Sequence, residues 1–198
     1  MTKIAIDIDG VLADLQIVMF KWHNLTYGTD ISPEKIISYD LSVSFQCSKE
    51  ESWKRVDEFF NSSYINLIAP IEGSVKAVKR LKKKHELYVV TSRSLNLQEH
   101  TITWIAKHFG NAFQQIVFSH NGKNKTYHSK SELCTKLGVT IIVEDCLEYA
   151  NECAKAGIDS LLFDLNGTYG WNKNGKVHQL VERVYSWKEI EMYADILS

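Results

Sequence analysis

Short apolar segments alternate with helix-like segments along most of this chain, and this alternation constrains the fold more than any other feature. Five runs bounded by polar residues have the length and composition of buried strands: residues 3–8, 87–91, 115–119, 140–144 and 160–164. Helix-like patterns lie between the later runs, at residues 72–84, 98–109, 131–137 and 147–156. Because strand–helix–strand order favours parallel pairing, the sequence predicts an α/β fold, with a Rossmann-like parallel sheet and helices on both faces.

One stretch, residues 15–70, interrupts this alternation directly after the first predicted strand. It contains no convincing strand, but it has helical patterns over residues 15–27 and 48–61. An insertion at this point would follow the end of the first strand. We therefore expect a core formed by residues 1–14 and 71–198, and a small helical cap formed by residues 15–70.

Composition and charge are those of an ordinary globular protein, and they exclude several classes of function. The 198 residues carry a formal net charge of −1, from 23 basic and 24 acidic side chains. This balance argues against nonspecific binding to a nucleic acid polymer. No apolar run approaches the roughly 18 residues that a membrane span needs, and the amino-terminal segment lacks the pattern of a signal peptide.

The four cysteines and seven histidines form no recognisable motif. No C-x-x-C pair occurs, and the histidines do not show the spacing of a zinc site. Four thiols are too few for a disulfide scaffold in a chain of this length, so we expect reduced cysteines in a cytoplasmic protein. The oligomeric state stays open, with a homodimer as one option.

Two aspartates one residue apart follow the first predicted strand and are the strongest functional signal. Asp7 and Asp9 belong to the run Asp-Ile-Asp-Gly-Val-Leu-Ala-Asp, at a strand end where open parallel sheets bind ligands. Such close carboxylates repel each other unless a cation offsets their charge. Asp7 could be a nucleophile and metal ligand, while Asp9 binds the metal through its backbone carbonyl and transfers protons through its carboxyl. The competing interpretation is a solvated turn, since Asp-Gly is a common turn dipeptide.

Two further segments carry side chains suited to phosphate chemistry, although each is weak by itself. Thr91, Ser92 and Arg93 close the second predicted strand, where a hydroxyl and a backbone N–H can hold a phosphate oxygen; Thr-Ser is also a frequent turn. Glu144 and Asp145 follow another buried strand and could complete a cation site of oxygen ligands. Without the first motif, Asp145 would be better explained as a helix N-cap.

A lysine near these segments could neutralise a nucleophile and a phosphate together. Lys130 is the first choice because it opens a predicted helix one strand before the Glu-Asp pair. Lys123 and Lys125 are alternatives for the same role. Taken alone, each would be interpreted as an ordinary surface lysine.

The order of these features resembles the four motifs of the haloacid dehalogenase (HAD) superfamily over nearly the whole chain. Within it, the run around the acid pair is similar to that of the 5'(3')-deoxyribonucleotidases and their bacterial relatives. The Thr-Ser pair, the position of the insertion and a late Gly170-Trp171-Asn172 loop add to the resemblance, because related sequences often carry Pro-Trp-Asn there. The family's paired aspartates are Glu144 and Asp145 here, and we favour Asp145 as the metal ligand.

The resemblance implies a Mg²⁺-dependent phosphatase. In such an enzyme Asp7 attacks phosphorus and forms an aspartyl-phosphate, and Asp9 protonates the leaving oxygen and then activates water. Mg²⁺ orients the phosphate and offsets charge, with Glu144 and Asp145 beside it. Lys130 and the Thr-Ser turn stabilise the pentacoordinate state.

The substrate is the part that the sequence determines least. The resemblance favours a small-molecule phosphate ester, with nucleoside monophosphates and deoxynucleotides first; a sugar or other small-metabolite phosphate is the alternative. A HAD-like binding module without turnover is a third interpretation, which the intact acid pair speaks against. Aromatic residues of the insertion could stack a base, or could equally be core residues at helical spacing. They are Phe20, Trp22, Tyr39, Phe45, Trp53, Phe59 and Phe60.

Overall fold

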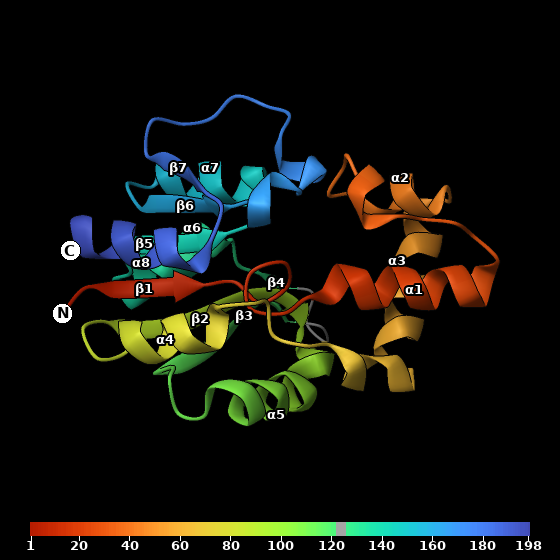
Figure 1. Cartoon of the computed structure of the whole chain (residues 1–198), viewed down its shortest axis with the longest axis horizontal. Helices are drawn as coiled ribbons and strands as arrows, with labels where there is room; N and C mark the ends of the chain where they lie inside the picture. Colours follow the sequence, from red (N-terminus) through yellow and green to blue (C-terminus); the bar gives the residue numbers. More distant parts are fainter. Residues whose placement is uncertain (122–125) are drawn as a thin grey trace.

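The structure is a computed structural model that describes residues 1–121 and 126–198. A seven-stranded sheet forms the centre of the described structure, and its strands lie in the order β4-β3-β2-β1-β5-β6-β7 (Figure 1). The strands are β1 (Lys3–Ile6), β2 (Glu86–Ser94), β3 (Gln115–Asn121), β4 (Thr126–Tyr127), β5 (Ile141–Glu144), β6 (Asp159–Phe163) and β7 (Val181–Val184). Neighbouring strands pair in parallel, except that β4 pairs antiparallel with β3.

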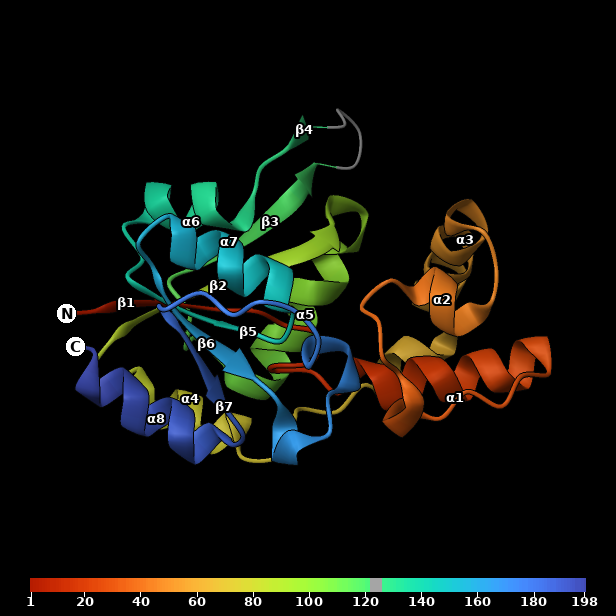
Figure 2. The same cartoon turned by 90° about the horizontal axis from the view of Figure 1, so that it is seen from above.

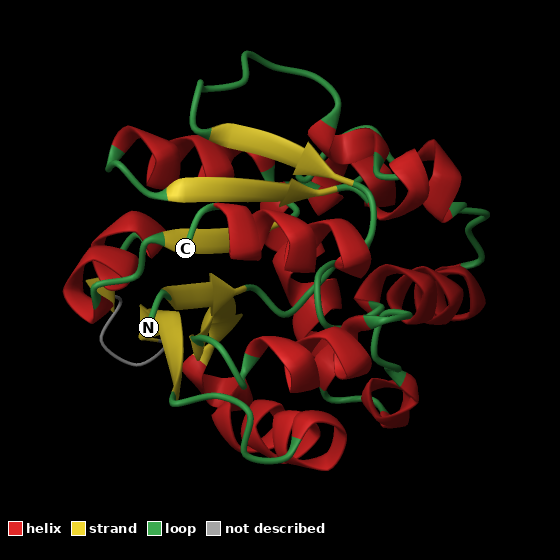
Figure 3. Cartoon of the chain, turned by 60° about the vertical axis from the view of Figure 1, so that its left-hand side comes forward, coloured by secondary structure: helices red, strands yellow, loops and turns green. Residues whose placement is uncertain are grey.

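Helices pack on both faces of this sheet (Figure 3). Those on one face are α4 (Ser74–Leu81), α5 (Gln98–Phe109) and α8 (Trp187–Ile196). Those on the other face are α6 (Lys130–Leu137) and α7 (Leu147–Lys155). The central strand shows why both faces need cover: Ile4 and Ile6 pack toward the first group, whereas Ala5 between them packs toward the second, and all three are fully buried. Strands buried on both faces have nearly continuous apolar sequences.

The predicted α/β fold is therefore confirmed, with some differences at the edges of the sheet. Strands β4 and β7 and helix α8 were not predicted. β4 has only two residues, and β7 carries Glu182 and Arg183 between its two valines, so neither strand gives an apolar run. The first predicted strand ends at Ile6 rather than Ile8, because the chain turns sharply after Asp7. Leu12 and Ala13 both donate their backbone N–H to the carbonyl of Ile8 in this turn.

A helical insertion follows β1, as predicted, and it lies beyond the carboxyl ends of the central strands (Figure 2). Its elements are α1 (Leu15–Tyr27), η1 (Pro33–Lys35), α2 (Leu41–Phe45), α3 (Lys49–Phe60) and η2 (Ser63–Leu67). Two of the inserted helices contact through aromatic side chains, since the rings of Trp22 and Phe59 meet edge to face at 5.6 Å. None of the helices in the described part of the chain is long and apolar enough to cross a membrane.

The insertion is joined to the core at a narrow base. Asp14 donates its backbone N–H to the carbonyl of Ala69 at 2.9 Å, and Ile71 donates to Leu12 at 2.8 Å. The outgoing and returning segments are thus hydrogen-bonded to each other beside the predicted boundaries. The division into a core and a cap at residues 15 and 70 stays a prediction.

His23 lies buried in the insertion and is held as a neutral imidazole. Its Nδ1 lies 2.8 Å from the Thr29 hydroxyl, which donates its own hydrogen to Asn24. Nδ1 must therefore donate, and Nε2 accepts from Arg55 at 3.2 Å. The ring also stacks on Phe45 at 4.0 Å between centroids. Burial, and then the charge of Arg55, lower the pKa of His23 to about 4.

We predict that acidification weakens the folded protein through His23. Below pH 6.5 the unfolded chain takes a proton on this imidazole, whereas the folded protein does so only near pH 4. The free energy of unfolding should fall between these pH values, by on the order of 3 kcal/mol. Urea denaturation should show a shallower pH dependence in His23→Gln and an unchanged one in His128→Gln, whose side chain is exposed. Equal slopes for wild type and His23→Gln would contradict this role.

Candidate active site

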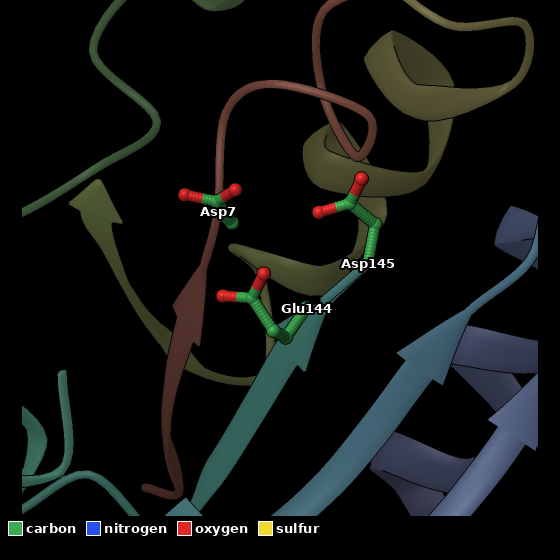
Figure 4. Close-up of side chains that lie close together, drawn as sticks. All are labelled: Asp7, Glu144 and Asp145. Carbon is green, nitrogen blue, oxygen red and sulfur yellow. The ribbon is translucent and has the colours of Figure 1, made fainter. Parts of the chain in front are cut away.

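Three acidic side chains meet at the carboxyl ends of β1 and β5. The two strands are neighbours, and their register pairs Ile6 with Val143. Asp7 and Glu144 each come one residue later, and Asp145 follows at once, so parallel pairing brings all three together. One carboxylate oxygen from each lies within 4.8 Å of the others, and all three side chains are buried (Figure 4).

Lys130 provides the positive charge closest to this cluster. It is the first residue of α6, whose start is fixed by a capping box between Ser129 and Glu132. Its ammonium group is fully buried and lies 2.9 Å from Asp7 Oδ1 and 2.5 Å from Glu144 Oε2. The structure thus places Lys130 beside Asp7; its predicted role of neutralising a nucleophile and a phosphate together stays a prediction. The alternatives Lys123 and Lys125 fall outside the described residues.

Burial and mutual repulsion shift the pKa values of these groups. Burial, helped by the charges of Glu144 and Asp9, raises the pKa of Asp7 to about 7, with Lys130 opposing the rise. The pKa of Asp145 is also raised well above its usual value, first by burial and then by Glu144 and Asp7. Burial alone would lower the pKa of Lys130, but Asp7 and Glu144 outweigh it and hold that pKa high. The cluster therefore carries more acid than its lysine can neutralise.

One oxygen of the cluster, Asp145 Oδ1, is shielded from solvent and has no hydrogen-bond partner among the described residues. The other oxygen of Asp145, Oδ2, accepts from the indole N–H of Trp171 at 3.1 Å. Both oxygens of Glu144 are used, by Lys130 and by the backbone N–H of Cys146 at 3.1 Å. Three buried acids with a free oxygen suit a hard cation, which binds oxygen ligands.

Gly10 allows the turn after β1 to approach this cluster. Its backbone has a φ of +79°, which side chains other than glycine rarely adopt. A Cβ atom here would lie 2.1 Å from Asp145 Oδ2. Glycine is thus needed at position 10 both for the turn and for the space beside Asp145.

Asp9 lies apart from the three clustered acids and forms a bidentate ion pair with Arg93. Nε and Nη2 of Arg93 reach the two Asp9 oxygens at 2.9 and 2.6 Å. Nη1 donates to Thr101, and the guanidinium lies 5.5 Å from the ring centroid of Phe60 in α3. Because its nitrogens already have partners, the predicted phosphate-binding role of Arg93 would require some of these bonds to be exchanged; it stays a prediction.

The Thr-Ser pair lies inside β2, which continues to Ser94. Thr91 is buried, and its hydroxyl accepts the backbone N–H of Arg93 at 3.2 Å. The hydroxyl of Ser92 is shielded from solvent and has no hydrogen-bond partner among the described residues. Ser92 also lines the cleft described below.

A cleft of about 240 Å³ lies between the insertion and the sheet. Asp7, Asp9, Thr91, Ser92 and Arg93 line it on the core side. Only three of the seven aromatic residues singled out in the insertion also line it, namely Phe20, Tyr39 and Phe60.

The other four aromatic residues lie elsewhere. Trp22, Phe45 and Phe59 are buried within the insertion, and Trp53 is 66% exposed. Helical spacing alone could not separate these groups, because the inserted helices pack against one another as well as facing the core.

Sequence reasoning missed two contacts that shape the site. The Arg93–Asp9 pair joins residues 84 positions apart, and no local pattern signals it. The bond from Trp171 to Asp145 lies in the late loop that was noticed only through family resemblance. A usable signal existed: two aromatic residues flank Gly170 shortly after a buried strand, at the sheet edge where ligands bind.

Comparisons with solved structures define the class of protein first. The fold matches a haloacid dehalogenase-like hydrolase from Streptococcus pneumoniae, with a TM-score of 0.69, 18% identity and 98% coverage of both chains. It also matches a HAD family hydrolase from Deinococcus radiodurans with bound phosphate and sodium, with a TM-score of 0.70, 15% identity and coverage of 100% of this chain and 96% of that one. The chain thus has a HAD-like fold.

Sequence comparison then gives the family. The model of the 5' nucleotidase, deoxy (pyrimidine), cytosolic type C protein matches residues 1–196. A nucleotidase from Clostridium acetobutylicum is 26% identical over 201 residues, covering 98% of this chain and 94% of the relative. A candidate nucleotidase from Halalkalibacterium halodurans is 25% identical over 197 residues, covering 98% and 92%. The chain belongs to this family of nucleotidases, which are phosphoric monoester hydrolases of the HAD superfamily.

We predict that Lys130→Met strongly destabilises the metal-free protein. Removing the ammonium leaves three buried acids without their nearest cation, and breaking a buried ion pair from one side costs roughly 3–5 kcal/mol. Lys173→Met is the matched control: its partner Asp164 keeps Arg183 at 3.1 Å, and Lys173 is 40% exposed. The control should lose about 1 kcal/mol or less. Equal losses in urea denaturation would mean that Lys130 does not balance the cluster.

Proposed function

We propose that this protein is a Mg²⁺-dependent phosphatase that hydrolyses nucleoside monophosphates, with Asp7 as the nucleophile. The observation that supports this most directly is the buried cluster of Asp7, Glu144 and Asp145 beside Lys130. Membership of a nucleotidase family supports the substrate class. We also propose a cytoplasmic location, which the description of the family as cytosolic supports.

The cation would be held by Asp7, Asp145 and the backbone carbonyl of Asp9, a set of hard oxygen ligands. The unpartnered Oδ1 of Asp145 supports its assignment as a direct ligand. Glu144 is less suited, because its two oxygens already bind Lys130 and a backbone N–H. Glu144 would instead hold the lysine in place. When bound, Mg²⁺ would orient the phosphate and offset negative charge.

Asp7 would attack phosphorus and form an aspartyl-phosphate. Only the ionised carboxylate can attack, and Lys130, 2.9 Å away, favours that form. Asp9 would give a proton to the leaving oxygen and then take one from the water that hydrolyses the intermediate. Both Asp9 oxygens accept from Arg93, so one of these hydrogen bonds would have to break when Asp9 carries the proton, while the other would keep the carboxyl oriented.

The negative charge that develops on the phosphoryl oxygens would be stabilised by Lys130 and by the Thr91–Ser92 segment. Ser92 supports this role because it lines the cleft and its hydroxyl has no hydrogen-bond partner among the described residues. Such preorganised donors lower the barrier, since they need no reorientation during the reaction.

Residues 15–70 would act as a cap that covers the leaving group. This division is supported by the narrow base at Leu12–Asp14 and by the position of the cleft under the inserted helices. Tyr39 and Phe60 line the cleft and could stack on a base. A sugar or other small-metabolite phosphate is the alternative substrate, and it would not use these aromatic faces in the same way.

The test is a side-by-side measurement of kcat/KM for deoxynucleotides, ribonucleotides and sugar phosphates. With Mg²⁺ present, we expect roughly a tenfold to hundredfold preference for nucleotides over ribose 5-phosphate, because one stacked base contributes roughly 1–3 kcal/mol. EDTA should abolish the activity. Undiminished hydrolysis after chelation would exclude the cation, and better cleavage of sugar phosphates would exclude the nucleotide preference.

A variant of Phe60 sharpens the same experiment. Phe60→Leu keeps apolar bulk beside Arg93 but removes the aromatic face. It should reduce the nucleotide preference while leaving p-nitrophenyl phosphate hydrolysis largely intact. Trp53→Leu is the matched control, because Trp53 lies on the same helix but is largely exposed to solvent. A preference that both variants retain in full would mean that Phe60 does not stack.

A further inference from the structure

The loop that follows β6 brings an indole N–H to the acid cluster. Trp171 Nε1 donates to Asp145 Oδ2 at 3.1 Å, and the next residue, Asn172, donates from Nδ2 to the Asp145 backbone carbonyl at 3.0 Å. The loop therefore contacts both the side chain and the main chain of this one acid. The other carboxylate oxygen, Oδ1, has no hydrogen-bond partner among the described residues.

The loop is held firmly enough to fix the indole. Tyr169 stacks on Trp171 with ring centroids 4.2 Å apart, and its hydroxyl donates to the Gly10 carbonyl at 3.0 Å. Asn172 is fully buried and donates a second hydrogen bond to the Phe163 carbonyl at 2.9 Å. These contacts connect the loop to the turn after β1 and to the end of β6.

The loop also contacts the insertion. A Cβ atom added at Gly170 would lie 2.3 Å from the backbone oxygen of Ile36, so the chain passes directly against the inserted segment. Trp171 itself lines the cleft below the insertion. Its side chain packs partly buried against the core cluster, with its N–H directed at Asp145.

A free carboxylate can rotate about its terminal torsion and exchange its two oxygens. A fixed donor on one oxygen removes that freedom. Figure 4 shows one oxygen of Asp145 turned toward Asp7 and Glu144. We propose that Trp171 is a positioning residue for the cation: its N–H binds one Asp145 oxygen and thereby presents the other to the metal. This inference rests on the proposed function for the existence of the cation site.

The test is the affinity of the folded protein for Mg²⁺, measured without substrate. A ligand that binds only the folded state raises the free energy of unfolding according to its Kd, so urea denaturation over a series of Mg²⁺ concentrations gives that Kd. Trp171→Phe keeps a ring to stack on Tyr169 but lacks the N–H donor. We expect its Kd for Mg²⁺ to rise by about tenfold or more, as is typical when the partner of a metal ligand is lost.

Trp104→Phe is the matched control. Trp104 also donates its indole N–H in a buried hydrogen bond, to the Ile68 carbonyl at 2.9 Å. This bond involves none of the three acids of the cluster. Its loss should lower stability without changing the Kd for Mg²⁺. Turnover of Trp171→Phe should approach that of the wild type when Mg²⁺ is saturating, a recovery that a purely structural defect would not show.

The outcomes separate this inference from the proposed function. A Kd for Mg²⁺ that is the same in wild type and Trp171→Phe would overturn the positioning role while leaving the phosphatase proposal intact. An equal rise in Trp104→Phe would also overturn it, because the effect would then reflect general destabilisation. A wild type that Mg²⁺ does not stabilise at all would overturn both the cation site and the role of Trp171.

Discussion

The buried ammonium group of Lys130 is the interaction on which the rest of the site depends. Parallel pairing of β1 with β5 places Asp7 beside Glu144, and repulsion between such close carboxylates in a buried environment would oppose folding. Lys130 bonds to both acids. A capping box fixes the helix end that carries it. The amino-terminal end of α6 is therefore connected, through Lys130, to the two central strands of the sheet.

The positive charge of Lys130 does not offset all of the negative charge of the acids, and the excess negative charge connects folding with function. One ammonium group faces three buried acids, and the pKa of Asp145 is raised because burial and its neighbours disfavour its charge. A cation that binds here would relieve the repulsion, so its binding would also stabilise the fold. The same excess of negative charge that costs stability would attract a cation to the site.

Two further parts of the chain hold the acidic side chains in position. Arg93 holds Asp9 apart from the cluster, and the loop around Trp171 holds Asp145. Both supports also contact the insertion or the cleft below it, through Phe60 and Gly170 respectively. Parts of the chain that line or adjoin the cleft thus contact the residues that hold the acids.

Much of this arrangement could be predicted from the sequence because it depends on local patterns. Strands buried on both faces gave apolar runs, and Asp7 and Glu144 stood at the carboxyl ends of two of them. The short edge strand β7 gave no such signal. The bond between Trp171 and Asp145 joins residues 26 positions apart, and only the folded chain brings them together.

Local sequence patterns also could not predict which aromatic side chains of the insertion face the cleft. Phe59 and Phe60 are adjacent in the sequence, yet one is fully buried and the other lines the cleft. Which face of an inserted helix meets the core depends on how the insertion is anchored at its base, and periodicity carries no information about that.

The central claim is that Asp7 becomes phosphorylated during turnover. Acid quenching during steady-state hydrolysis, followed by borohydride reduction, would convert an aspartyl-phosphate to homoserine that peptide mass spectrometry can locate. The account predicts homoserine at Asp7 in wild-type protein with substrate, and none in Asp7→Asn or without substrate. Steady phosphate release with no modification at Asp7, or with the modification at another residue, would contradict it.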